Sequence, residues 1–108
     1  DIEDGSRLVD EEQFGPVLPV IRYSDADDAV SRANASDYGL GGSIWSSSND
    51  DAYDLALKME SGSVWINKHA DLAPNIPFGG ARFSGLGTEL GEEGLLEFTQ
   101  LKVINMAR

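Results

Sequence analysis

We expect the fold to be organised around the stretch Glu12-Gln13-Phe14-Gly15-Pro16-Val17-Leu18-Pro19-Val20, which places a rigid turn directly before an apolar run. Pro16 fixes its own φ and biases the residue before it toward extended backbone. Residues 17–23 are rich in Val, Ile and Tyr, so they predict a strand. Glu12 and Phe14 therefore precede a strand that we expect to be buried, on a loop of the kind that presents binding groups.

Helix and strand signals alternate beyond this stretch. Ser24 can cap a helix, and the apolar residues after it recur at helical spacing. The expected order is a strand at 17–23, a helix at 24–35, a strand at 40–46, a helix at 48–60 and a strand at 63–67. Strands joined in this way form right-handed βαβ crossovers. The sequence thus predicts an α/β fold whose mainly parallel sheet is built from two βαβ crossovers.

The ends of the chain carry weaker signals. Residues 1–9 predict a loose start that ends in a short strand. Residues 68–87 lack regular patterning, but their apolar content predicts a long ordered loop. A short helix is expected from about Thr88 or Gly91 to Phe98. Residues 101–106 alternate apolar and polar side chains, which predicts a terminal strand that reaches outside the fold.

Composition limits the classes of function. The 108 residues suit one domain, and they carry a formal net charge of −11. Such acidity disfavours nucleic acid and anionic membranes as partners. No apolar run approaches the roughly 20 residues of a membrane span. The chain has no cysteine and one histidine, so it holds neither a thiol nucleophile nor an evident metal site.

Four segments together resemble the NAD(P)-dependent aldehyde dehydrogenases. The stretch from Glu12 to Val20 is the first. The other three follow in the family's order and are YGLGGSIW at 38–45, GSVWIN at 62–67 and PFGGARFSGLG at 77–87. The resemblance is to the C-terminal part of the catalytic domain of that family. It implies an enzyme that oxidises aldehydes to carboxylic acids with NAD or NADP.

The resemblance also implies site residues. Glu12 matches the family's acceptor for the nicotinamide-ribose hydroxyls, and Phe14 matches an aromatic beside the nicotinamide. Phe78 matches a residue of the aldehyde pocket, and His69 and Leu72 lie in its variable substrate loop. Each has an ordinary structural alternative: a solvated acid at Glu12, a surface histidine at His69, and core aromatics at the two phenylalanines.

The family's catalytic cysteine has no counterpart here. We therefore expect residues 1–108 to be part of a larger cytoplasmic enzyme, to contain no catalytic residue, to be inactive alone and to bind NAD weakly or not at all. The alternative is a non-catalytic, self-associating α/β module. In either case residues 101–108 match the family's oligomerisation strand, so a homo-oligomer is expected.

Overall fold

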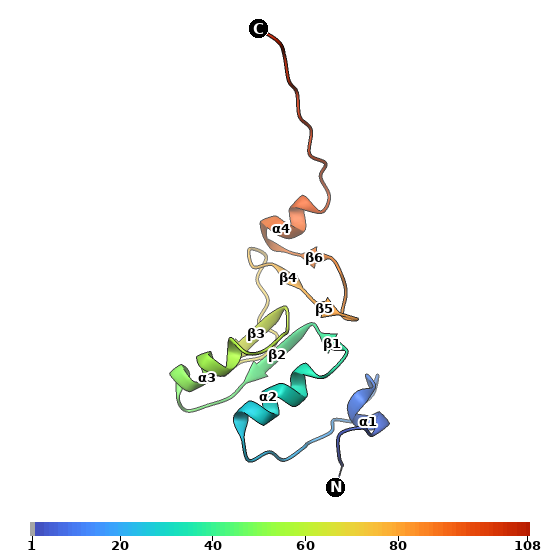
Figure 1. The fold of residues 1–108 in the computed structure, drawn as a ribbon, viewed down its shortest axis with the longest axis vertical. Helices are drawn as coiled ribbons and strands as arrows, with labels where there is room; N and C mark the ends of the chain where they lie inside the picture. Colours follow the sequence, from blue (N-terminus) through green and yellow to red (C-terminus); the bar gives the residue numbers. More distant parts are fainter. Residues whose placement is uncertain (1) are drawn as a thin grey trace.

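A computed structural model describes residues 2–108. These residues form short helices and short strands, followed by an extended C-terminal segment (Figure 1). The helices are α1 (Arg7–Asp10), α2 (Ala26–Asn34), α3 (Asn49–Ala56) and α4 (Gly91–Leu96). The strands are β1 (Tyr38–Gly39), β2 (Gly41–Ile44), β3 (Ser63–Ile66), β4 (Phe78–Gly79), β5 (Ala81–Arg82) and β6 (Thr88–Glu89).

The centre of the fold is the unit β2–α3–β3. The two strands pair in parallel, with Gly41 opposite Ser63 and Ile44 opposite Ile66. The helix between them begins where expected, because the Ser48 side chain accepts a hydrogen bond from the backbone N–H of Asp51. The structure thus contains one βαβ crossover of the two expected, and its helix ends at Ala56 rather than at the predicted residue 60.

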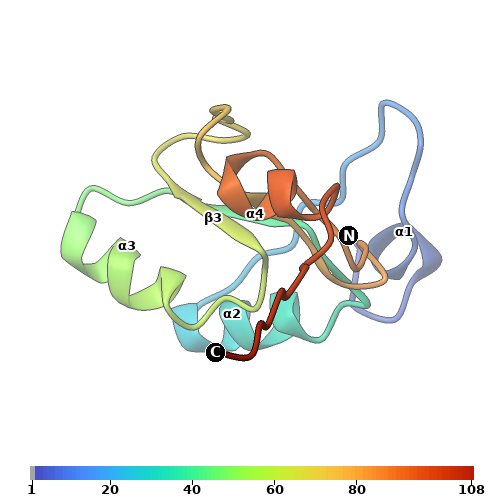
Figure 2. The same ribbon diagram turned by 90° about the horizontal axis from the view of Figure 1, so that it is seen from above.

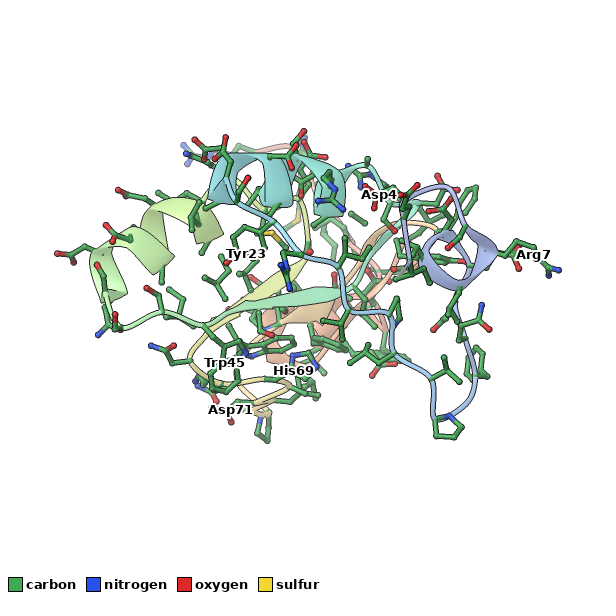
Figure 3. All side chains as sticks on the ribbon, turned by 90° about the horizontal axis from the view of Figure 1, so that it is seen from below. Asp4, Arg7, Tyr23, Trp45, His69 and Asp71 are labelled. Atoms are coloured by element: carbon green, nitrogen blue, oxygen red, sulfur yellow. The ribbon has the colours of Figure 1, made fainter. Side chains whose placement is uncertain are left out.

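Helix α2 packs beside this unit. Its capping residue lies one position later than expected, because the side chain of Asp25 rather than Ser24 accepts from the N–H of Asp27. Val30 is the buried residue of its inner face. In Figures 2 and 3, α2 lies on one side of the β2–β3 pair and the loop after β3 lies on the other.

The first predicted crossover is not present. Residues 17–23 run as extended chain without strand pairing, so the strand predicted there is wrong. The prolines at 16 and 19 remove two backbone donors, and Leu18 and Val20 remain largely exposed. Strand propensity was the whole basis of the prediction, and propensity does not form a strand without an adjacent edge to pair with.

The second half contains more strand than expected. Instead of an unpatterned loop at 68–87, β4 pairs with β6 and β5 pairs back to β1, both antiparallel. Helix α4 ends at Leu96, two residues earlier than predicted. Near the start of the chain, α1 forms a turn of helix where a short strand was expected.

The terminal segment leaves α4 as extended chain that projects away from the rest (Figure 1). Residues 97–108 are exposed and contain no strand, so the predicted terminal strand is not formed here. Within the described residues, the buried apolar side chains are those of Val30 and Ala52. The radius of gyration is 18.2 Å, against about 13 Å for a compact domain of this size. Most of the large apolar side chains of residues 2–108 therefore remain exposed to solvent.

Candidate functional site

The loop that carries Glu12 and Phe14 is braced from one side. Glu11 accepts two hydrogen bonds from Arg7, at 2.7 and 2.9 Å, and this pairing raises the pKa of the arginine. The Gln13 side chain donates to the carbonyls of Arg7 and Glu11. These contacts tie the residues on both sides of Glu12 to α1, and they leave its own side chain uncommitted.

Glu12 and Phe14 both face solvent. Within residues 2–108, the Glu12 carboxylate has no hydrogen bond or ion pair. The ring of Phe14 is 96% exposed. Neither side chain is therefore part of a core, which removes the structural alternative for Phe14 in this structure. A carboxylate free of protein partners can accept hydrogen bonds from an external donor.

An open hollow of about 690 Å³ lies beside Glu12. Its wall includes Tyr38 from β1, the glycines of β2, and Phe83 and Ser84 after β5. The Ser84 hydroxyl accepts a hydrogen bond from the N–H of Gly39 at 3.0 Å, which fixes this side of the wall. The hollow therefore borders Glu12, β1 and β2.

A separate aromatic group lies around β3. The Trp65 and His69 rings meet edge to face with centroids 5.5 Å apart, and Trp65 and Phe78 are 6.4 Å apart. Both distances are typical of favourable aromatic pairs. Leu72, on the loop after β3, is 49% exposed. The structure thus gathers His69 and Phe78 around Trp65, a residue that the sequence analysis did not select.

Asn67 anchors the loop that follows β3. Its side-chain oxygen accepts from the N–H of Ser46 at 2.9 Å, and its amide donates to the Ser46 carbonyl at 2.9 Å and to Asn49 at 3.3 Å. Its φ of 54° is a left-handed conformation that asparagine tolerates better than most residues. An asparagine directly after an apolar strand was the sequence signal for this anchor, and it was not used.

The loop is held again four residues later. The indole Nε1 of Trp65 donates to the carbonyl of Asp71 at 3.1 Å, and Lys68 forms an ion pair with the Asp71 carboxylate at 2.7 Å. Ala70 between them has a φ of 51°, which is costly for alanine. Figure 3 shows His69 and Asp71 on this loop, on the side of the sheet away from α2. The contacts on both sides of Ala70 keep the strained loop in one shape.

The two groups of predicted site residues do not meet. Figures 1 and 2 show the loop after α1 and the loop between β3 and β4 in different parts of the molecule. The structure therefore groups His69 with Phe78 and places Glu12 and Phe14 elsewhere. Among the described residues, no cluster of histidine and acidic side chains could hold a metal ion. No helix between residues 2 and 108 is long and apolar enough to cross a bilayer.

Comparison with known proteins decides the family. Residues 1–104 match the model of the aldehyde dehydrogenase family. The chain belongs to this family. It is 48% identical over 105 residues to geranial dehydrogenase of Castellaniella defragrans and 47% identical over 104 residues to the NADP(+) succinate-semialdehyde dehydrogenase of Deinococcus radiodurans. Each alignment covers 96% of this chain and 22% of the relative.

A solved aldehyde dehydrogenase shares the fold. The Mycobacterium tuberculosis enzyme, determined in complex with NAD+, aligns over 93% of this chain and 20% of its own length. The TM-score is 0.88 and the sequence identity is 40%. The α/β arrangement and the oxidoreductase family are thereby established. The chain spans about a fifth of the length of these relatives, so it corresponds to one part of such an enzyme.

Proposed function

We propose that residues 1–108 form the C-terminal part of the catalytic domain of an NAD(P)-dependent aldehyde dehydrogenase. The observation that carries the proposal is the family match over residues 1–104, together with an uncommitted Glu12 carboxylate beside an open hollow. The reaction is the oxidation of an aldehyde to a carboxylic acid.

Glu12 and Phe14 would hold the nicotinamide end of the cofactor. An ionised carboxylate can accept hydrogen bonds from both hydroxyls of a ribose, and such charge-assisted bonds are stronger than neutral ones. Because Glu12 has no competing protein partner among residues 2–108, its carboxylate suits this role. The exposed ring of Phe14 can pack beside the nicotinamide. When bound, the cofactor supplies the acceptor for the hydride.

Phe78, His69 and Leu72 would form one wall of the aldehyde pocket. The aromatic group around Trp65 gives this wall a fixed shape, and the anchored loop presents His69 at its edge. We assign His69 a contact role rather than proton transfer, since its contact in the structure is the Trp65 ring and no carboxylate pairs with it among the described residues.

The family's reaction uses a cysteine thiolate, and this chain contains no cysteine. The nucleophile that attacks the aldehyde would therefore be supplied by residues outside this chain. We therefore propose that the isolated 108 residues do not oxidise aldehydes and bind NAD weakly or not at all. Cytoplasmic location also remains a proposal that comes from the family.

The test uses the longest natural polypeptide that contains these residues, beside residues 1–108 alone. Both are mixed with an aldehyde and NAD+ or NADP+, and formation of the reduced cofactor is followed. We expect turnover from the longer polypeptide and none above background from the shorter one. Activity of the isolated residues would refute their proposed dependence on the missing part. A longer polypeptide that oxidises no aldehyde would refute the proposed enzymatic activity.

A second candidate function is self-association through the terminal segment. Leu101 is 95% exposed, and Val103, Ile104 and Met106 are exposed beside it. An extended apolar segment with unpaired backbone groups is a template for pairing with another chain. Light scattering of residues 1–108 should show an oligomer, and removal of residues 101–108 should give a monomer. A monomer at high concentration with the segment intact would count against it.

A further inference from the structure

The residue before α4, Leu90, has a backbone conformation that is rare for leucine. Its φ is 63° and its ψ is 175°, a region that is essentially restricted to glycine, because a Cβ collides there with neighbouring backbone. Glycine would adopt the same conformation at little steric cost. The next residue, Gly91, also has a positive φ, of 64°. The chain therefore makes a sharp and strained turn between β6 and α4.

Both neighbours of Leu90 are held in place. On one side, Glu89 belongs to β6 and pairs with Phe78 of β4. On the other side, the N–H of Gly91 donates a hydrogen bond to the carbonyl of Pro74 at 3.0 Å. Strained backbone persists only where its surroundings over-determine it. The contacts on the two sides of Leu90 meet this condition.

Helix α4 lies directly against the strand that precedes it. The N–H of Gly94 donates to the carbonyl of Leu90 at 2.9 Å, and Gly94 is buried. A Cβ added at Gly94 would lie 2.7 Å from the carbonyl carbon of Glu89, so the two backbones meet without room for a side chain. The turn at Leu90 and this close approach together set the direction of α4.

The terminal segment, residues 97–108, continues from α4. Its first turn is still tied to the helix, because the N–H and the hydroxyl of Thr99 both donate to the carbonyl of Leu96. Within the described part of the chain, residues 100–108 make no hydrogen bond or ion pair. They project away from the rest of the molecule (Figure 1). Twelve extended residues reach about 40 Å, so the direction of α4 decides where the segment ends.

We propose that Leu90 is a strained hinge that directs the terminal segment away from its own chain and presents it to a second copy of this chain. The inference rests on the self-association proposed above. A loosely jointed segment would sample many directions, including those that fold its apolar side chains back onto its own chain. Because the hinge excludes these directions, less conformational freedom is lost when two copies associate.

The experiment compares Leu90→Gly with Leu90→Ala in the longest natural polypeptide that contains these residues. Both variants lose the leucine side chain, but only glycine relieves the strained backbone. Leu90→Gly should therefore unfold at a higher temperature than Leu90→Ala. It should nevertheless associate more weakly, with a dissociation constant about five- to tenfold larger by analytical ultracentrifugation. Simple damage to the fold would instead lower both quantities together.

Ala70→Gly is the matched control, because Ala70 also has a positive φ, of 51°, but lies on the loop after β3. This variant should raise the thermal transition and leave the dissociation constant unchanged. A second readout is single-molecule energy transfer at concentrations where the protein is monomeric. Dyes attached through non-natural amino acids at the exposed positions Asp54 and Met106 should report a broader distance distribution in Leu90→Gly than in Leu90→Ala.

Each other outcome overturns the inference. A dissociation constant that is equal in the two Leu90 variants contradicts it, and so does a distance distribution of equal width. A Leu90→Gly protein less stable than Leu90→Ala would show that the backbone at residue 90 is not strained. These results leave self-association standing. A protein that is monomeric at every concentration refutes the self-association and the inference together, without bearing on aldehyde oxidation.

Discussion

The indole nitrogen of Trp65 donates a hydrogen bond to the backbone carbonyl of Asp71 at 3.1 Å. A residue in the middle of strand β3 thereby holds a point on the following loop. The same indole ring meets His69 edge to face. The shape of the loop therefore depends on a strand residue, which makes the proposed pocket wall part of the scaffold.

Trp65→Phe should loosen this loop. The variant keeps an aromatic ring but loses the N–H donor, and a hydrogen bond of this kind contributes about 1 kcal/mol. We expect a loss of about 1 kcal/mol or more in the free energy of unfolding, measured by urea denaturation, and faster hydrogen exchange at the loop amides. The control is Trp45→Phe, since Trp45 is 67% exposed and should cost no more than about 0.5 kcal/mol. Equal effects of the two variants would contradict this role of Trp65.

Replacement of Asn67 should lower stability in two ways. The side-chain hydrogen bonds are lost, and the left-handed backbone is costly for most other residues. Asn67→Gly removes three side-chain hydrogen bonds but keeps the left-handed backbone accessible. Asn67→Ala removes the same bonds and adds the left-handed cost of about 1–2 kcal/mol. Chemical denaturation should rank the unaltered protein above the glycine variant, and the glycine variant above the alanine variant. An alanine variant as stable as the glycine variant would show that the φ of 54° is not needed.

Gly62→Ala should be severely destabilising. A Cβ at this position would overlap the carbonyl oxygen of Gly79 on β4, so two backbones would have to separate. Overpacking typically costs 1–3 kcal/mol and can cost more, and here backbone cannot move aside as a side chain would. Gly15→Ala is the matched control, because no atom lies within 4 Å of its added Cβ. The thermal transition should fall sharply in the first variant and little in the second. A stable Gly62→Ala protein would refute this close approach of Gly62 to Gly79 of β4.

The ion pair between Arg32 and Asp4 should make stability depend on acid pH. The hydrogen bond from Arg32 lowers the pKa of Asp4 from its ordinary value of 3.8. A carboxyl group with a lowered folded pKa contributes stability that is present above 3.8 and is lost as the pH falls through the folded value. The Asp4 pKa, followed by NMR titration, should rise toward 3.8 in Arg32→Gln.

The control for this titration is Arg22→Gln. Arg22 has no ion pair among the residues that the structure describes, so its replacement should leave the pKa of Asp4 unchanged. Because Asp4 is exposed to solvent, the effect should also weaken at high salt. An Asp4 pKa that is the same with and without Arg32 would contradict the pairing.

Glu12→Gln should weaken cofactor binding by the longer polypeptide or slow its reaction. The amide oxygen can still accept hydrogen bonds, but the bonds to the ribose hydroxyls are no longer charge-assisted. We expect a rise of roughly tenfold in the KM for the cofactor or a comparable fall in kcat. Glu3→Gln is the control, because the Glu3 side chain is exposed and has no hydrogen bond or ion pair among the described residues. If both variants behave alike, the assignment to Glu12 is wrong.

The sequence predicted those elements whose causes are local. Helix α3 follows from the Ser48 cap and its apolar stripe, and β3 follows from the Val-Trp-Ile run at 64–66. Parallel pairing of β2 with β3 was then dictated by the helix between them. For α2 the sequence predicted the helix but not its capping residue. Both Ser24 and Asp25 can cap a helix, and only the folded geometry selects Asp25.

Elements that depend on distant partners were predicted poorly. Residues 17–23 have strand composition but no paired edge, and the two-residue strands β1 and β5 pair across more than 40 positions of sequence. At the candidate site, the sequence selected Phe78 and His69. It missed Trp65 and Asn67, because their roles are hydrogen bonds to residues that only folding brings near.

The cofactor role of Glu12 is tested most directly by a crystal structure, with NAD+ bound, of the longest natural polypeptide that contains these residues. We expect both Glu12 carboxylate oxygens at hydrogen-bond distance, about 2.7 Å, from the two hydroxyls of the nicotinamide ribose, with Phe14 against the nicotinamide. A bound cofactor whose ribose is held by other residues, with Glu12 directed into solvent, would contradict it.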